Sequence, residues 1–173
     1  MKRKGFLLFL LVSLVLLINI NSCYLKNNNM FNIQSLNSGD LILQKDPDNL
    51  SLEGNYGHIQ LYLGYGFVIE AEPPQVHLDR LSGGSVYRVK TDSLTRSFAV
   101  GWAISKLGYP YDYNYTYKQI NGNSYYCSEL CWSSYFIKGI NIDKDPLWES
   151  KFGFGVTVME IVEDEKTYFV GII

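Results

Sequence analysis

The sequence has few charged residues and few cysteines. Lysine and arginine number 15 against 17 aspartate and glutamate, which leaves a formal net charge of −2 at pH 7. Because binding to phosphates needs an excess of cationic side chains, this composition gives no reason to expect a nucleic-acid-binding protein. Three cysteines in 173 residues are too few for a disulfide scaffold. Hydrophobic residues make up 47% of the chain, which is enough for a buried core and argues against wholesale disorder.

The N-terminal apolar run, Phe6–Ile18, is too short to cross a bilayer, since a membrane-spanning helix needs ~20 residues. It has instead the length of a signal-peptide core, ~7–15 residues, and basic residues precede it at positions 2–4. The segment Ile20-Asn21-Ser22-Cys23 then resembles a bacterial lipobox. We therefore expect a signal peptide over residues 1–22 and a diacylglycerol on Cys23. An ordinary signal peptide with an incidental cysteine, or an uncleaved signal anchor, is the alternative.

Residues 23–38 are polar and rich in asparagine, a composition typical of a flexible tether, and a folded domain is expected over residues 39–173. Removal of residues 1–22 would take away three basic and no acidic residues. The mature chain would then have 12 basic and 17 acidic groups, a net charge of −5. Electrostatics alone would not draw such a chain to anionic lipid. We expect the lipid on Cys23 to hold it in the bacterial cell envelope, outside the cytoplasm.

The pattern of apolar and turn-forming residues predicts short strands around two helices, and therefore an α+β fold. A turn at Gly39-Asp40 opens the domain, and Gly108 and Gly139 end the two helical patterns. Residues 45–55 are expected to form a loop. The expected strands lie at residues 41–43, 58–63, 67–71, 86–89, 155–162 and 168–173, and the expected helices at residues 95–107 and 127–138.

The predicted hairpin at residues 58–71 places a histidine near a carboxylate. Alternation along the first strand sets His58 and Gln60 on the polar face, and Glu70 and Glu72 share that face on the return strand. Two registers keep the apolar faces together: one sets His58 opposite Glu70, and the other sets His58 opposite Glu72 and Gln60 opposite Glu70. In either register a carboxylate can orient the imidazole of a general base. The alternative is a surface His–Glu pair, and His77 is expected to lie in a loop.

A cysteine marks the start of the second predicted helix. Residues 121–124, Asn-Gly-Asn-Ser, are typical of a turn and a helix cap, so Cys127 falls in the first helical turn. Free N–H groups and the helix dipole favour a thiolate there, and the same groups can stabilise an oxyanion. A buried, inert thiol is the alternative for Cys127. Cys131, one turn later, is expected to be a small buried hydrophobe, although a Cys-x3-Cys zinc site is another interpretation.

The sequence resembles the YiiX/YebB-like cysteine hydrolases, a circularly permuted branch of the papain-fold NlpC superfamily. The resemblance covers residues 39–136. It implies a permuted papain-like α+β fold in which an antiparallel sheet packs on the helix that bears the nucleophile. It also implies that Cys127 is the nucleophile, His58 the base and Glu70 the orienting residue, in the register that pairs His58 with Glu70. The matching segments are Gly39–Ile42, Tyr56–Gly64, Val68–Ala71, Lys106–Asp112 and Tyr126–Leu130.

The resemblance further implies a hydrolase that cleaves an amide through a thioester acyl-enzyme, without a metal or an organic cofactor. Gln60, Tyr126 and Ser128 are candidates for contacts with the substrate or the oxyanion. The expected partner is a peptide or acyl-amide substrate, with a peptidoglycan stem peptide favoured over a lipid. A lipid acyl hydrolase or acyltransferase of the same fold, and a non-catalytic binding lipoprotein, are the alternatives. Alternating tyrosines between positions 109 and 117 form either an aromatic wall of the site or ordinary packing.

Overall fold

The computed structural model describes residues 32–45, 56–115, 117–145 and 154–173, all of which belong to the compact unit Asn32–Ile173. The expected signal peptide and Cys23 lie outside the described residues, as do most of the expected tether and of the loop at 45–55. A search of the described residues finds no helix with the length and apolar character of a membrane span.

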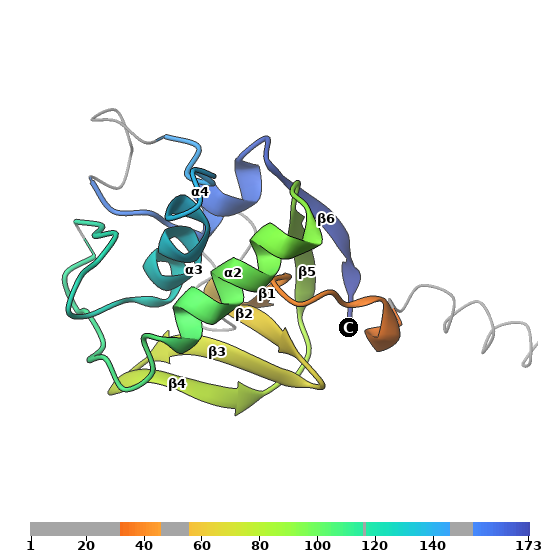
Figure 1. Cartoon of the computed structure of the whole chain (residues 1–173), viewed down its shortest axis with the longest axis horizontal. Coiled ribbons are helices and arrows are strands. Elements are labelled where there is room, and N and C mark those ends of the chain that lie inside the picture. Colours follow the sequence, from red (N-terminus) through yellow and green to blue (C-terminus); the bar gives the residue numbers. More distant parts are fainter. Residues whose placement is uncertain (1–31, 46–55, 116, 146–153) are drawn as a thin grey trace, which may run out of the picture. The chain divides into compact units, whose positions relative to one another are not determined.

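Helices and strands fill most of the described chain (Figure 1). The elements are η1 (Ile33–Ser35), β1 (Leu41–Lys45), β2 (Tyr56–Gly64), β3 (Phe67–Glu72), β4 (Gln75–Arg80), β5 (Ser85–Val89), α2 (Ser93–Ile104), α3 (Cys127–Phe136), α4 (Val158–Glu163) and β6 (Thr167–Ile172). The expected α+β fold is confirmed, and both expected helices are present with ends shifted by a few residues, as is usual for local patterns.

The strands form one six-stranded sheet in the order β4-β3-β2-β1-β5-β6, with every neighbouring pair antiparallel. Between β2 and β3, Leu61 pairs with Ile69. Continued along the strands, this register sets Gln60 opposite Glu70, and the expected pairing of His58 with Glu70 is therefore wrong. Both registers bury the same apolar face, so alternation does not distinguish them. The hairpin turn selects the register, which shifts between Tyr62 and Gly64.

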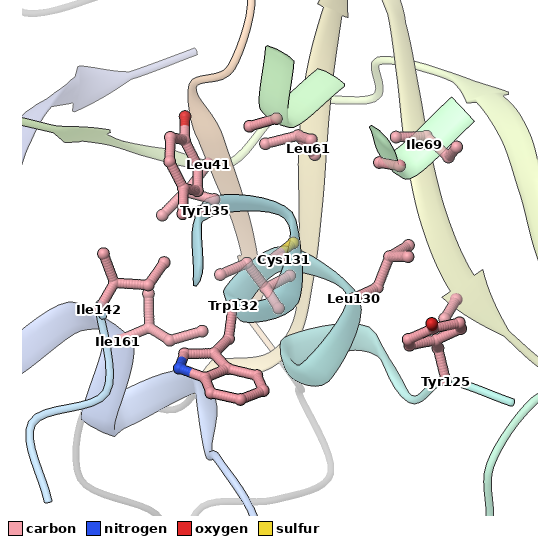
Figure 2. Close-up of a cluster of buried hydrophobic side chains, with 14 of the residues drawn as sticks. Leu41, Leu61, Ile69, Tyr125, Leu130, Cys131, Trp132, Tyr135, Ile142 and Ile161 are labelled. Carbon is pink, nitrogen blue, oxygen red and sulfur yellow. The ribbon is translucent and has the colours of Figure 1, made fainter. Parts of the chain in front are cut away.

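Helix α3 packs against the middle of the sheet. It contacts β2 and β3, and α2 contacts α3 and β2; Figure 1 shows α2 and α3 beside one another in front of the sheet. In Figure 2, Leu61 and Ile69 of the sheet face Leu130 and Cys131 of α3 across the core. Burying these side chains stabilises the fold by roughly 1.5–3 kcal/mol for each large aliphatic residue. The expected packing of an antiparallel sheet on the helix that begins at Cys127 is confirmed.

Helix α3 is buried on every side, which its sequence alone does not suggest. All residues from Ser128 to Tyr135 are buried. Its buried hydroxyls need acceptors, because an unpaired polar group in a core is costly. Ser133 donates to the carbonyl of Gln119 at 2.9 Å, and Ser134 donates to the carbonyl of Cys131 at 2.7 Å. The helix that carries Cys127 is thus held firmly in place.

The turn at Gly39-Asp40 anchors β1 to the helices. Gly39 has φ of 91°, and a Cβ atom there would lie 2.8 Å from both the Cβ of Arg96 and the hydroxyl of Tyr135, so only glycine fits. Tyr135 donates to the Gly39 carbonyl at 2.5 Å. Asp40 is fully buried and accepts two hydrogen bonds from Arg88, at 2.7 and 2.8 Å. The Gly-Asp pair therefore has a structural role.

One expected strand is a helix instead. Residues 155–162 contain most of α4, which begins after Thr157. The Thr157 hydroxyl accepts from the N–H of Glu160 at 3.1 Å, and Glu160 accepts from the N–H of Thr157 at 2.6 Å. This reciprocal capping box starts a helix that a short apolar run cannot distinguish from a strand. The strand expected at residues 168–173 is confirmed as β6.

His77 lies in a strand and not in the expected loop. It belongs to β4, where it pairs directly with Glu70 of β3. Val76 is buried and Leu78 is half exposed. Although β4 is the edge strand of the sheet, residues 108–111 bind its first half from the outer side, where the N–H of Val76 donates to the Tyr109 carbonyl at 2.8 Å. Such an edge strand is mostly polar, which is why its short segment resembled a loop. The pairing brings a second histidine to Glu70.

Candidate active site

Cys127 is the first residue of α3 and is half-buried. The first hydrogen bond within the helix runs from the N–H of Leu130 to the carbonyl of Tyr126, at 3.0 Å. The N–H groups of Cys127 and Ser128 precede it and so have no partner along the helix axis. They form the positive end of the helix dipole at Cys127. The expected position of Cys127 in the first helical turn is confirmed.

His58 and Gln60 extend from β2 to the same carboxylate on β3. Nε2 of His58 lies 2.5 Å from Oε2 of Glu70, and the side-chain amide of Gln60 donates to that oxygen at 2.7 Å. Glu70 itself is 2% exposed. Gln60 lies directly across from Glu70, whereas His58 approaches it diagonally. The single carboxylate therefore orients the imidazole and is itself held by an amide.

The charges of this group favour an imidazolium. Burial alone would lower the pKa of His58, but hydrogen bonds to Cys127 and Glu70 and the charges of both groups raise it to about 10. Burial alone would raise the pKa of Glu70, but the hydrogen bonds from His58 and Gln60 hold that pKa below its usual value. Because Nε2 of His58 is taken by Glu70, Nδ1 is the ring nitrogen left for Cys127. Cys127 and Glu70 thus both act on the same imidazole, Glu70 through a hydrogen bond at 2.5 Å and Cys127 through its effect on the pKa of His58.

The three further candidates, Gln60, Tyr126 and Ser128, are all buried, and each side chain has a protein partner. Gln60 donates to Glu70, as described above. The Tyr126 hydroxyl accepts from the N–H of Val156 at 2.9 Å, and the Ser128 hydroxyl donates to the carbonyl of Val156 at 2.7 Å. These side chains hold the helix start, the hairpin and the approach to α4 together. The backbone N–H groups of Cys127 and Ser128 are the donors available to an oxyanion.

Several tyrosines that precede Cys127 in the chain contact one another. The rings of Tyr111, Tyr115 and Tyr126 contact one another edge-on in series, with centroids 6.3 and 5.7 Å apart, and Tyr113 contacts Tyr111 at 5.0 Å. Burial raises the pKa of Tyr111, as do its hydrogen bond to Tyr115 and the nearby Cys127. Tyr113 is 68% exposed and Tyr115 is 53% exposed. The segment therefore both packs against the helix start and presents aromatic surface to solvent.

Glu129 is a buried carboxylate that the sequence analysis did not single out. Its two oxygens accept from the N–H of Gln119 at 2.5 Å and from the N–H of Tyr126 at 3.4 Å. Burial raises the pKa of Glu129 to about 8, against the opposing effect of these two N–H groups. Its position two residues after Cys127 suits a capping glutamate, and that signal could have identified it. Glu129 ties the tyrosine-rich segment to the start of the nucleophile helix.

A second group of titratable residues adjoins Glu70. One ligand atom each from Glu70, Glu72 and His77 lie within 4.8 Å of one another, which makes them the group that could hold a metal ion among residues 32–45, 56–115, 117–145 and 154–173. Nε2 of His77 lies 3.5 Å from Oε1 of Glu70, the oxygen that His58 and Gln60 do not use.

Cys131 is fully buried in the core, and burial raises the pKa of its thiol far above the usual value.

Comparisons with known proteins agree with this fold. A family model described as "Permuted papain-like amidase enzyme, YaeF/YiiX, C92 family" matches residues 35–151, more than half of the chain. The uncharacterized protein YycO of Bacillus subtilis (strain 168) is 30% identical over 123 residues, which cover 65% of this chain and 48% of YycO. The chain thus spans about half the length of that curated relative.

A solved structure has a similar fold. The crystal structure of metalloprotein YiiX from Escherichia coli O157:H7 superposes with a TM-score of 0.61 and 18% sequence identity, over 78% of this chain and 96% of YiiX. At this identity the likeness concerns the fold alone.

Proposed function

The chain belongs to the permuted papain-like amidases of the YaeF/YiiX, C92 family, an amidase- or peptidase-type group of cysteine hydrolases, and we propose that it cleaves a cell-wall peptide amide through a thioester on Cys127. In this proposal His58 is the general base and acid, Glu70 orients it, and a lipid on Cys23 anchors the domain to a membrane.

The His58–Glu70 pair and its link to Cys127 are the observation that carries this proposal. The imidazole of His58 lies 2.5 Å from a buried carboxylate, and the hydrogen bond and charge of Cys127, a thiol at a helix start, help to raise the pKa of that imidazole. A nucleophile, a base and an orienting group in hydrogen-bonding contact define such sites by their roles, whatever their order along the chain. An inert buried thiol would have no reason to face a histidine held in this way.

Acylation follows from the geometry of the three residues. The thiolate of Cys127 attacks the amide carbonyl carbon, and the carbonyl oxygen becomes an oxyanion held by the N–H groups of Cys127 and Ser128. The His58 imidazolium gives its Nδ1 proton to the amide nitrogen as the carbon–nitrogen bond breaks. The amine leaves, and the acyl group remains on sulfur as a thioester.

Deacylation uses the same residues in reverse. Neutral His58 takes a proton from water, the resulting hydroxide attacks the thioester carbonyl, and the thiolate of Cys127 leaves as the carboxylic acid forms. Glu70 stays ionised throughout and stabilises the imidazolium before each turnover. These steps need no redox or Lewis-acid chemistry, in keeping with a reaction in which only protons and an acyl group move.

The choice of a peptidoglycan stem peptide rests on two considerations. The family is one of amidases, and the expected export places the domain beside the cell wall. The exposed rings of Tyr113 and Tyr115 belong to the aromatic series that ends at Tyr126, the residue before Cys127, and they offer an uncharged amphipathic surface that suits a glycopeptide. The same surface suits an acyl chain, so a lipid acyl hydrolase or acyltransferase is the second candidate.

Intact-mass spectrometry tests the reaction. We expect an acyl adduct on the wild-type protein after incubation with muropeptides, no adduct on Cys127→Ala, and no adduct with phospholipid vesicles. An adduct with vesicles alone would identify the lipid acyl hydrolase. An adduct that persists until an acceptor amine is added would identify an acyltransferase. If neither substrate acylates Cys127, and His58→Ala leaves the rate of alkylation by iodoacetamide unchanged, the protein is a non-catalytic binding protein.

Metabolic labelling tests the anchor. Cells grown with a palmitate analogue should label the wild-type protein, because acyl chains join the proposed N-terminal Cys23. The Cys23→Ala variant should carry no label, and Cys131→Ala serves as a control for labelling at another cysteine. Equal label on wild type and Cys23→Ala would contradict the lipid anchor without affecting the proposed hydrolysis.

A further inference from the structure

We propose that Glu70, Glu72 and His77 bind one divalent transition-metal ion, for which zinc is the best match. Glu70 and Glu72 are two positions apart on β3 and therefore share a face of the sheet, and His77 pairs directly with Glu70 from β4. One ligand atom from each residue lies within 4.8 Å of the other two. The site shares Glu70 with the proposed catalytic group but uses its other oxygen, Oε1, and its existence does not depend on the proposed hydrolysis.

The spacing between His77 and Glu70 is that of two ligands of one ion. Nε2 of His77 lies 3.5 Å from Oε1 of Glu70, longer than the usual ~2.7–3.2 Å of an N–H···O hydrogen bond. Tetrahedral zinc with bonds of ~2.0–2.2 Å places neighbouring ligand atoms about 3.4 Å apart. The other oxygen of Glu70, Oε2, already accepts from His58 and Gln60. Oε1 is thus the oxygen that remains for a cation.

The hydrogen bond of His77 to the backbone determines which nitrogen can bind. Nδ1 lies 2.9 Å from the carbonyl oxygen of Gln75, and a carbonyl oxygen only accepts, so Nδ1 carries the proton. In the neutral ring the lone pair is then on Nε2, which faces Glu70. Histidines that bind metals usually donate their other ring N–H to a carbonyl or carboxylate in this way. Two acceptors that face each other at 3.5 Å favour a cation between them.

Burial and charge also suit a bound ion. The Glu70 side chain is 3% exposed and that of His77 is 32% exposed, while Glu72 lies at the surface. An ion can therefore enter from solvent past Glu72 and bind Oε1 of the buried Glu70. Two carboxylates offset part of its double charge, since Glu70 also pairs with His58, and an imidazole with two carboxylates is a donor set that zinc accepts, with water as the fourth ligand. A proton on Nε2 of His77 is the competing occupant of the same space.

Metal titration of the full chain tests the site, in a Cys127→Ser background so that the thiol cannot bind the ion. We expect one Co2+ ion per chain by visible absorption, displaced by Zn2+, and the same stoichiometry for Zn2+ by calorimetry. Glu72→Gln and His77→Asn should each weaken the affinity at least tenfold. Asp79→Asn is the matched control, since Asp79 is an exposed carboxylate on the same strand as His77, and it should bind as the parent does.

Three results would overturn the metal site. One is the absence of stoichiometric binding at millimolar Co2+ or Zn2+. Another is binding that neither Glu72→Gln nor His77→Asn weakens, or that Asp79→Asn weakens equally, since that would reflect surface charge alone. The third comes from NMR: if the ring of His77 binds and releases a proton on Nε2 identically with and without Zn2+, a proton occupies the space. Circular dichroism of each variant shows whether it is folded.

Discussion

Glu70 holds His58 from a diagonal position and not from directly across the hairpin. The residue opposite Glu70 is Gln60, and both His58 and Gln60 bind the same oxygen, Oε2, at 2.5 and 2.7 Å. The diagonal arrangement has two consequences. It gives the carboxylate a second, neutral donor that fixes its orientation, and it leaves Oε1 free to face His77 on the next strand.

Replacement of Glu70 by glutamine should slow catalysis strongly while preserving the fold. Glutamine has the same shape, but it lacks the charge that stabilises the His58 imidazolium. We expect kcat/KM to fall roughly 10²–10⁴-fold, the range for loss of general acid–base function. Steady-state kinetics with the muropeptide substrate measure this, and Asp79→Asn, which also removes one carboxylate from the sheet, should retain full activity. A fall of less than threefold would show that Glu70 does not orient the base.

Replacement of Gln60 by leucine distinguishes a positioning role from an oxyanion role. Because its amide donates to Glu70, we expect kcat to fall about tenfold with KM nearly unchanged, and the stability to fall by ~1–3 kcal/mol because a buried acceptor loses a partner. Loss of an oxyanion donor would instead cost about 10²–10³ in kcat. Kinetics and urea unfolding together decide between the two roles. Gln44→Leu, which removes a neighbour 3.4 Å from Gln60, is the control and should have a smaller effect on kcat.

Glu129 should make the protein less stable as the pH rises from about 4.5 to about 8. Its pKa is about 8 in the folded chain, above the usual 4.5, so between these values the folded chain holds a proton that the unfolded chain has released. Each pH unit in this window costs up to ~1.4 kcal/mol, and partial solvation reduces the total to about 3 kcal/mol. The raised pKa of His58 acts in the same direction. Glu129→Gln should therefore flatten the pH dependence of the unfolding free energy only in part; an unchanged slope would contradict the prediction.

Replacement of Arg88 by methionine should destabilise the domain by about 3–5 kcal/mol, because it leaves the Asp40 carboxylate buried without a counter-ion. The site should keep its kcat where the protein remains folded, since Arg88 lies on β5, away from the catalytic hairpin. Urea unfolding measures the loss. Arg80→Met, at an exposed arginine of β4, is the matched control and should cost less than ~1 kcal/mol. An equal loss of unfolding free energy in the two variants would show that the Asp40–Arg88 pair contributes no more to stability than an exposed arginine does.

The proposed catalytic residues came from local patterns and a family resemblance together. Cys127 follows a turn and precedes a helical pattern, and His58 lies on the polar face of an alternating strand whose hairpin partner carries Glu70. These patterns alone left an inert thiol and a surface His–Glu pair as alternatives, and the order of five matching segments favoured the catalytic roles. Glu129 could have been identified from a local pattern, because its spacing from the helix start is that of a capping residue.

The supporting contacts were not accessible in this way. His77 was expected in a loop, since the edge strand β4 is short and largely polar. The side chains of Tyr126 and Ser128, expected near the substrate, contact Val156 of a distant segment. Residues 155–162 were expected as a strand because a short apolar run has no periodicity of its own, and the capping box decided in favour of a helix.

The sequence by itself determined the α+β class, the helix that begins at Cys127 and the hairpin that carries His58, because alternation, turns and helix starts are local signals. Only the tertiary structure decided the register of that hairpin, the burial of α3 on every side and the approach of His77 to Glu70. The physical reason is that two registers bury the same apolar face equally well, so that the turn and the packing of neighbouring elements make the choice. That choice placed Gln60 opposite Glu70, His58 on the diagonal and His77 at the free oxygen.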